Sequence, residues 1–268
     1  MDVQKRAVLL KLRGLQIDRI AKLIGKSERT VNRYTQDIRH PKNIGANPLP
    51  RNATGLSKEK AEIIGFLTSE GTHYKQFEDR LEFHKKRNKH YRRTRSRDVI
   101  EFSNEDSVLI NRFQHLMQAV YGYKPKLRER GKIFIRRTKV IRDLLSYTDF
   151  GSRKWKVPEE LFNSSDDIKS SFLRAHYDGD GSVYVKQVRV YSINERGLSQ
   201  MRNLMLSLGI ETKLYCWKNV NALSLPSRHI PAFQERIGFL HPERKRRLRE
   251  AAKLIGAGRG NLQSYRTF

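Results

Sequence analysis

The chain has 268 residues, and its 55 lysines and arginines outnumber its 28 aspartates and glutamates, giving a net charge of +27 at pH 7. This excess predicts a polyanionic partner, and the spread of basic residues along the chain favours nucleic acid over a membrane surface. A heat-adapted surface is the alternative, but such surfaces mix both signs of charge.

Cys216 is the only cysteine, which excludes an intrachain disulfide and a cysteine-based zinc site. No stretch approaches the roughly 20 apolar residues of a membrane span and no signal peptide is evident, so we expect a cytoplasmic protein that does not enter membranes.

Residues 1–38 are predicted to form a small all-α domain. Stretches with apolar residues at helical spacing lead up to Gly25, which makes a turn, and Ser27 is a favourable N-cap for a third helix. The span 20–34 resembles a helix-turn-helix of the recombinase and sigma-factor type. The side chains that would read the major groove from its last helix are Arg29, Asn32 and Arg33. A helical hairpin that only caps the main domain is the alternative.

Residues 39–55 are rich in proline and asparagine and predict an extended linker. Beyond them the same order of predicted elements occurs twice, in repeats at 56–150 and 151–255, followed by a glycine-rich flexible tail at 256–268. In each repeat a helix is followed by strands, a second helix, further strands and a short third helix. We therefore expect a duplicated α+β fold.

Apolar periodicity and helix-ending glycines set the boundaries of these elements. In the first repeat the predicted helices are 57–69, 108–121 and 140–146, and the strands are 72–83, 98–103 and 133–136. In the second repeat the predicted helices are 166–179, 198–208 and 230–236, and the strands are 182–192 and 222–225.

One segment, between Leu81 and Val99, has no counterpart in the second repeat. Its many basic residues favour two long strands joined by a basic turn, which would form a phosphate-binding ribbon; a disordered basic loop is the alternative. The basic residues of this region and of the strands beside it that we expect to contact DNA are Lys75, Arg80, Lys85, Lys86, Arg87, Arg92, Arg93 and Arg95. In the second repeat we expect Lys186 and Arg189 to do the same.

Two nine-residue stretches look like copies of each other: 63–71, with the sequence IIGFLTSEG, and 173–181, with the sequence LRAHYDGDG. Each places two small residues four positions apart, on one face of a predicted helix. These are Gly65 and Ser69 in the first copy and Ala175 and Gly179 in the second. Helices with such faces can pack backbone to backbone.

Packing of this kind would bring Glu70 and Asp180 together at the C-terminal ends of the two helices, beside backbone carbonyls freed by the helix ends. Two carboxylates with carbonyl oxygens form a hard, oxygen-only site that suits Mg²⁺ or Mn²⁺. Like charges this close would repel one another without a cation. We therefore expect a metal site formed by Glu70, Asp180, Ser69 and Gly179.

These motifs resemble those of the LAGLIDADG homing endonuclease family. The second copy matches the family motif at Leu173, Asp178, Asp180 and Gly181. The first copy has Glu70 in the acidic position and matches at Gly65, Leu67 and Gly71. The resemblance covers 56–248 and implies two pseudo-symmetric αββαββα halves, whose saddle-shaped sheets grip the major groove of double-stranded DNA. It also implies metal-dependent hydrolysis of both strands, giving staggered ends.

By the same resemblance, Glu70 and Asp180 would each ligate metal and activate water, although Glu70 replaces the commoner aspartate. The family places a basic residue near each metal site late in each repeat, and the candidates are Lys154 or Lys156, and Lys245. A polar residue at the end of the second strand often holds water, and Asn104 fits that place; its counterpart near 192–194 stays open. The bulky motif residues Arg174, His176 and Tyr177 are expected to face sheets or outer helices.

The leading hypothesis is a site-specific double-strand DNA homing endonuclease that uses Mg²⁺ or Mn²⁺. The helix-turn-helix would extend its footprint, and the duplication favours a monomer, because both halves of the site are in one chain. A transcriptional regulator on the same scaffold with lost cleavage, and an RNA maturase, are the alternatives. The two retained acids favour the endonuclease, because a protein that only binds phosphates has no need of clustered negative charge.

Overall fold

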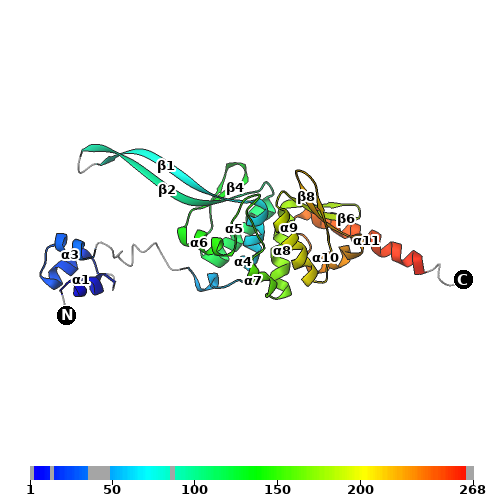
Figure 1. The fold of residues 1–268 in the computed structure, drawn as a ribbon, viewed down its shortest axis with the longest axis horizontal. Helices are drawn as coiled ribbons and strands as arrows, with labels where there is room; N and C mark the ends of the chain where they lie inside the picture. Colours follow the sequence, from blue (N-terminus) through cyan, green and yellow to red (C-terminus); the bar gives the residue numbers. More distant parts are fainter. Residues whose placement is uncertain (1–2, 13–14, 36–48, 85–87, 264–268) are drawn as a thin grey trace. The chain divides into compact units, whose positions relative to one another are not determined.

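The structure is a computed structural model that describes residues 3–12, 15–35, 49–84 and 88–263 (Figure 1). The chain divides into two compact units, Met1–Pro48 and Leu49–Phe268. Of the predicted linker, residues 39–48 lie outside the described part. Residues Arg51–Ala53 form a short 3-10 helix, η2, and Ala53 is buried in the core of the larger unit. Among the described helices, none has the length and apolar character needed to span a membrane.

The smaller unit contains the three predicted helices, α1 (Val3–Leu12), α2 (Ile17–Ile24) and α3 (Glu28–Tyr34). Gly25 ends α2 with φ 66°, a left-handed conformation that glycine adopts without steric cost. The Ser27 hydroxyl accepts a hydrogen bond of 3.3 Å from the Thr30 N–H and so caps α3. These local signals explain why the two helices begin and end where they do, while a DNA-reading role for α3 stays a prediction.

The larger unit contains two repeats of seven elements in the same order. The first repeat consists of α4 (Lys58–Glu70), β1 (Gly71–His84), β2 (Lys89–Ser103), α5 (Ser107–Tyr121), β3 (Leu127–Arg128), β4 (Lys132–Ile135) and α6 (Thr138–Tyr147). The second consists of α8 (Asp166–Asp180), β5 (Gly181–Tyr184), β6 (Gln187–Ser192), α9 (Glu195–Ser207), β7 (Lys213–Cys216), β8 (Asn221–Leu225) and α10 (Ile230–Arg236). The short helix α7 (Glu159–Phe162) joins the repeats, and α11 (Pro242–Gln263) follows them.

Each repeat forms one antiparallel four-stranded sheet, in the order β1-β2-β4-β3 and β5-β6-β8-β7. The identical strand order confirms the predicted duplicated α+β fold. Helices cover one side of each sheet (Figure 1), where alternate strand residues such as Phe102 and Ile133 are buried. The residues between them point to the opposite side, which we call the outer face.

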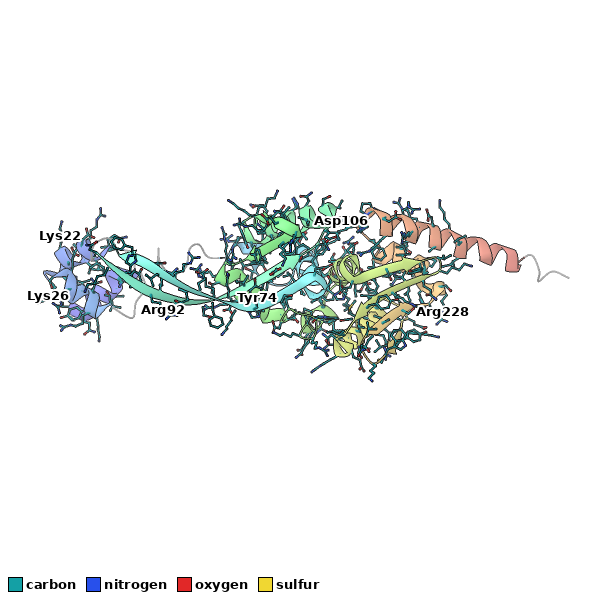
Figure 2. The ribbon with its side chains drawn as sticks, turned by 90° about the horizontal axis from the view of Figure 1, so that it is seen from above. Lys22, Lys26, Tyr74, Arg92, Asp106 and Arg228 are labelled. Atoms are coloured by element: carbon teal, nitrogen blue, oxygen red, sulfur yellow. The ribbon has the colours of Figure 1, made fainter. Side chains whose placement is uncertain are left out.

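The strands β1 and β2 pair along their whole length, from Gly71 with Phe102 to His84 with Lys89, and form a long two-stranded ribbon (Figure 1). Tyr74 lies near its base and Arg92 farther out (Figure 2). The predicted long strands are therefore present, and the predicted DNA contacts Lys85, Lys86 and Arg87 lie outside the described residues.

Much of the positive charge of the ribbon is paired. Arg93 forms an ion pair with Glu82 at 2.8 Å, and Arg97 and Arg80 both approach Glu78, at 3.6 and 3.8 Å. On the opposite side of the ribbon, Arg92 donates to Asp79 at 2.9 Å. The ribbon is therefore less strongly cationic than its run of arginines suggested.

The helix α11 continues to Gln263, across the region where glycines predicted a flexible tail from residue 256. Glycine costs about 1 kcal/mol of helix stability at each position but does not forbid a helix. The predicted tail and the end of this helix therefore overlap.

Candidate functional site

The helices α4 and α8 pack at backbone distance through the predicted small residues. A Cβ atom added to Gly65 would lie 2.3 Å from the carbonyl oxygen of Phe172 and 2.9 Å from the Cβ of Ala175. At the C-terminal end of the pair, a Cβ on Gly179 would lie 2.2 Å from Ser69 Oγ and 3.0 Å from Glu70 Cγ. A Cβ at either glycine would force the neighbouring atoms to shift, so Gly65 and Gly179 set how closely the two helices approach.

Glu70 and Asp180 are the last residues of these two helices and interact electrostatically. Burial raises the pKa of Asp180 to about 7, and the negative charge of Glu70 contributes to this rise. Burial also raises the pKa of Glu70, while Arg244 and a hydrogen bond from Asn104 act in the opposite direction. Two partly buried acids that disfavour each other's charge provide a place where a cation lowers the free energy.

An open cleft of about 440 Å³ lies beside Glu70. From the first repeat it is lined by Glu70, Asn104 and Asp106, and from the second by Gly179, His241 and Arg244. Asn104 donates its side-chain N–H to Glu70 Oε1 at 3.0 Å, and its own Oδ1 accepts from the Asp106 N–H at 2.8 Å. The structure therefore brings the predicted Asn104 to Glu70 and fixes its orientation.

Arg244 is a cleft residue that the sequence did not single out. Its guanidinium donates hydrogen bonds to the backbone carbonyls of Asp178 and Gly179, the second at 3.2 Å, at the end of α8. Its positive charge opposes the rise in pKa of both Glu70 and Asp180. The predicted metal ligand Gly179 thus has its carbonyl oxygen bound to an arginine in this structure.

His241 also reaches the cleft, and its Nε2 lies 3.3 Å from Asp106 Oδ2. Its backbone position is held by Asp178, whose carboxylate accepts the N–H groups of Leu240 and His241 at 3.0 Å. Burial raises the pKa of Asp178 to about 6, although these two N–H donors stabilise its charged form. Asp178 therefore ties α8 to the segment that carries His241 and Arg244.

The bulky residues of the second motif do not separate the helices. Tyr177 is buried in the second repeat, where its ring meets those of Phe233 and Phe239 at 5.0 and 6.4 Å. The expectation that His176 faces a sheet or an outer helix is wrong, because the residue is buried at the interface with α4. Burial lowers its pKa to about 3, so the ring is neutral. Thr68 Oγ1 donates to the Gly65 carbonyl and is 2.8 Å from His176 Nδ1, so the imidazole donates to it across the interface.

Arg244 lines the cleft, but the equivalent position late in the first repeat holds a different residue. Trp155 and Arg244 each lie five residues after a matching phenylalanine, Phe150 and Phe239. Trp155 is buried, with its ring 4.8 Å from that of His176, and its carbonyl accepts from Asn194. The tryptophan fills the interior where Arg244 lines an open cleft.

The counterpart of Asn104 differs as well. Asn104 and Ser192 each accept the backbone N–H two residues ahead, which belongs to the N-cap residue of the next helix. The Asn194 side chain caps α9 by accepting from the Gly197 N–H at 3.0 Å. Ser192 is therefore the structural equivalent of Asn104, and its shorter side chain has no amide to offer Asp180.

The predicted lysines lie apart from this cleft. Lys154 and Lys156 are exposed and do not line it. Lys245 lines a different cavity of about 290 Å³, together with Arg174 and Phe239. A catalytic role for any of the three stays a prediction that the geometry does not favour.

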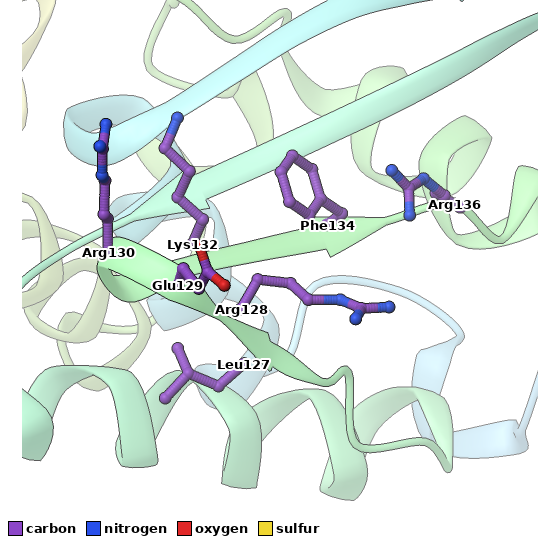
Figure 3. A pocket seen from close by; sticks show the side chains of 7 residues that line it. All are labelled: Leu127, Arg128, Glu129, Arg130, Lys132, Phe134 and Arg136. Carbon is purple, nitrogen blue, oxygen red and sulfur yellow. The ribbon is translucent and has the colours of Figure 1, made fainter. Parts of the chain in front are cut away.

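The outer face of the first sheet carries basic residues that the sequence did not single out. A cavity of about 750 Å³ is lined by Arg128, Arg130, Lys132 and Arg136, together with Leu127, Glu129 and Phe134 (Figure 3). Of the predicted contacts, Arg80, Arg93 and Arg95 lie on the same face of the ribbon, whereas Lys75 and Arg92 lie on the opposite face. Lys186 and Arg189 lie at the β5–β6 hairpin, and Arg29, Asn32 and Arg33 are exposed on α3.

Metal coordination would depend on few side chains. Among the described residues, no group of three or more His, Cys, Asp and Glu side chains is arranged to hold a metal ion. Glu70 and Asp180 offer two carboxylates whose mutual repulsion favours a divalent cation, and this oxygen-only donor set suits Mg²⁺ or Mn²⁺. The residues present fit such an ion, with remaining ligands to come from water or a bound phosphate.

Residues 167–238 match the model of a LAGLIDADG-like domain. Two longer proteins are similar in sequence to part of this chain. One is a probable translation initiation factor IF-2 of Thermococcus kodakarensis, 30% identical over 118 residues that are 43% of this chain. The other is a DNA polymerase of Thermococcus hydrothermalis, 25% identical over 138 residues that are 46% of this chain. The chain spans only 10% and 8% of the lengths of these relatives, so their named activities do not transfer to it.

Solved structures share the fold of the larger unit. I-DmoI in complex with DNA and Mn matches with a TM-score of 0.51 at 16% identity, over 68% of this chain and 97% of that one. I-DmoI in complex with DNA and Ca matches with a TM-score of 0.52 at 17% identity, over 70% and 96%. The chain therefore contains a LAGLIDADG-like domain at residues 167–238, and its larger unit has the two-repeat LAGLIDADG fold of a single-chain homing endonuclease.

Proposed function

We propose that the protein is a site-specific DNA endonuclease that hydrolyses phosphodiester bonds with the help of a divalent metal ion, Mg²⁺ or Mn²⁺. The observation that carries the proposal is the meeting of Glu70 and Asp180 at the ends of two helices packed at backbone distance. Two partly buried acids beside an open cleft are costly to maintain in a protein that only binds phosphates. The net charge of +27 supplies the attraction for the nucleic acid.

Glu70 and Asp180 would hold the ion, which supplies positive charge to polarise a phosphate and to make a water molecule more acidic. Asn104 keeps the Glu70 carboxylate oriented, and its amide is available to a water molecule in the cleft. Arg244 lies beside both acids, where its guanidinium can donate to a phosphate oxygen as negative charge develops. Asp178 holds the backbone that carries Arg244 and His241 in place.

The outer faces of the two sheets would lie against double-stranded DNA, as the resemblance to LAGLIDADG homing endonucleases implies. The exposed Arg29, Asn32 and Arg33 of the smaller unit would add a second contact to the duplex. With both acids in one chain, a monomer suffices to cut both strands and to leave staggered ends.

A DNA-binding regulator without cleavage is the second candidate. It is favoured by the hydrogen bond between Arg244 and the Gly179 carbonyl, which occupies an oxygen that a metal ion would otherwise use. In that case Arg244 would replace the metal as the cation that stabilises the paired acids. RNA is an alternative partner on the same charge argument.

The test is to incubate the full-length protein with a pool of random DNA duplexes in Mg²⁺ and to sequence all new ends. If the protein is an endonuclease, we expect discrete breaks that disappear in Glu70→Gln and Asp180→Asn. Both variants should still bind the duplexes in EDTA. Sequence-selective retention without breaks in Mg²⁺ or Mn²⁺ would instead establish the regulator. A pool of structured RNAs, run in parallel, reports the third possibility.

A further inference from the structure

The outer faces of the two sheets offer different chemistry to a bound duplex. On the first sheet, Arg128, Lys132 and Arg136 lie with Arg130 around one basic cavity (Figure 3). Lys132 forms an ion pair with Glu101 at 2.7 Å. Over the described residues, no ion pair engages Arg128, Arg130 or Arg136, although Glu129 lies in the same cavity. The first sheet therefore presents three guanidinium groups that are free to bind a ligand.

One of these guanidinium groups is already held in a defined plane. The Arg136 guanidinium lies 4.9 Å from the centre of the Phe134 ring, and its Nη2 is 3.5 Å from the side-chain oxygen of Gln76. Both neighbours lie on the outer face, and Phe134 pairs with Glu101 in the register of β2 and β4. An arginine held against an aromatic ring loses less side-chain entropy when it binds.

The second sheet presents aromatic rings in the corresponding place. Tyr191, Tyr215 and Trp217 are 37%, 43% and 51% exposed, and the rings of Tyr215 and Trp217 stack at 5.9 Å with an angle of 11°. Tyr191 and Tyr215 both pair with Ala222 in the sheet register, and Ala222 has no exposed surface. Tyr191 and Tyr215 therefore flank the buried Ala222 on the outer face and, with Trp217, present exposed aromatic surface there. Arg189 and Lys213 lie in the next row of the same face.

These two surfaces match different features of the major groove. Arginine pairs in bidentate fashion with the O6 and N7 acceptors of guanine, whereas apolar side chains contact the methyl group of thymine. We infer, building on the proposed function, that the two halves of the DNA target differ in base composition. The half bound by the first repeat is read through guanines by Arg128, Arg130 and Arg136, and the half bound by the second is read through thymine methyl groups by Tyr191, Tyr215 and Trp217.

The test selects duplexes that the full-length protein retains from a random pool in EDTA, so that cleavage plays no part. The expected motif has a guanine-rich half and a thymine-rich half. Arg136→Lys keeps the charge but loses the planar fork, so it should reduce guanine preference by about tenfold or more at one or two positions of one half. Tyr215→Ala should flatten thymine preference in the other half alone.

A chemical substitution in the DNA provides an independent readout. Replacing thymine by uracil in the selected duplex removes only the methyl group, and should weaken binding when made in the thymine-rich half and not in the other. Equal composition of the two halves, no selected motif, or an Arg136→Lys variant with unchanged guanine preference would overturn the inference. A separate result would contradict the endonuclease proposal: the selected duplexes would bind but would stay intact when Mg²⁺ is added.

Discussion

The close packing of α4 and α8 gives a prediction whose magnitude follows from the structure. Gly65→Ala places a methyl group 2.3 Å from the Phe172 carbonyl oxygen, a backbone atom that cannot rotate away. Overpacking of this kind costs about 1–3 kcal/mol, and the better helix propensity of alanine returns about 1 kcal/mol. Because the contact is with backbone, we take the upper part of the range and expect a net loss of about 2 kcal/mol.

Gly256→Ala is the matched control, because a Cβ at Gly256 meets nothing within 4 Å. It lies in α11, so the same substitution should leave the stability unchanged or raise it by up to about 1 kcal/mol. The assay is urea and thermal unfolding of both variants and the wild-type protein. For a unit of this size a loss of about 2 kcal/mol corresponds to a melting temperature lower by roughly 4–8 °C.

The same substitution should also affect the chemistry. Moving α4 away from α8 displaces Glu70 relative to Asp180, so Gly65→Ala should lose cleavage even at temperatures where it remains folded. A Gly65→Ala protein as stable as Gly256→Ala would show that the helices are not in backbone contact. That result would remove the geometric basis for pairing the two acids.

The remaining predictions concern charge and the order in which the two DNA strands are cut. The raised pKa of Asp180 means that folding favours its protonated form. In EDTA, the unfolding free energy should therefore fall as pH rises from about 4 through about 7. The fall should be less steep in Asp180→Asn. Mg²⁺ should reverse this trend, and cleavage should rise over the same interval; a flat stability profile in EDTA would contradict the burial of this acid. Replacing Glu78 and Glu82 by glutamine frees their arginine partners on the ribbon. Duplex binding should then tighten and depend more steeply on salt, as measured by fluorescence anisotropy at several salt concentrations. An unchanged salt dependence would show that the ribbon does not contact phosphates. Arg244→Ala should abolish or strongly slow cleavage while selective duplex binding in EDTA persists. In the wild-type protein, the strand served by the Glu70 cleft should be cut before the other, as measured by labelling the ends of each strand separately. Equal rates on both strands would argue that the two half-sites are equivalent.

Much of the fold could be predicted from local signals, although the single strand predicted at 182–192 is in fact the hairpin of β5 and β6. The boundaries of α10 agree with the prediction, and those of α4 and α8 differ from it by one residue at each shifted end, because caps and amphipathic periodicity mark them. The edge strands β3 and β7 were not predicted, since two to four residues carry too little periodicity to be detected. The continuation of α11 beyond Gly256 was not predicted either, because composition indicates low helix propensity without deciding the outcome.

The site could be predicted only in part. A repeated motif and a strand end predicted where Glu70, Asp180 and Asn104 lie, whereas Arg244 and His241 reach the cleft from the opposite repeat. That approach depends on how the repeats pack, which no local pattern contains. Neighbouring residues on a helix point about 100° apart, so the predicted Lys245 and the observed Arg244 face different cavities although they are adjacent in sequence.

The two halves of the site have diverged in a way that the duplicated fold conceals. A duplication supplies two equivalent positions for each functional group, but here one of each pair has been used for packing. Trp155 fills the interior against His176 where Arg244 lines a cleft, and Ser192 closes a turn where Asn104 also orients a carboxylate. Close helix packing needs both copies of the motif, whereas the polar side chains around each acid can differ between the two halves without disturbing that packing. Polar side chains from both repeats therefore line the cleft beside Glu70, whose negative charge also contributes to the raised pKa of Asp180.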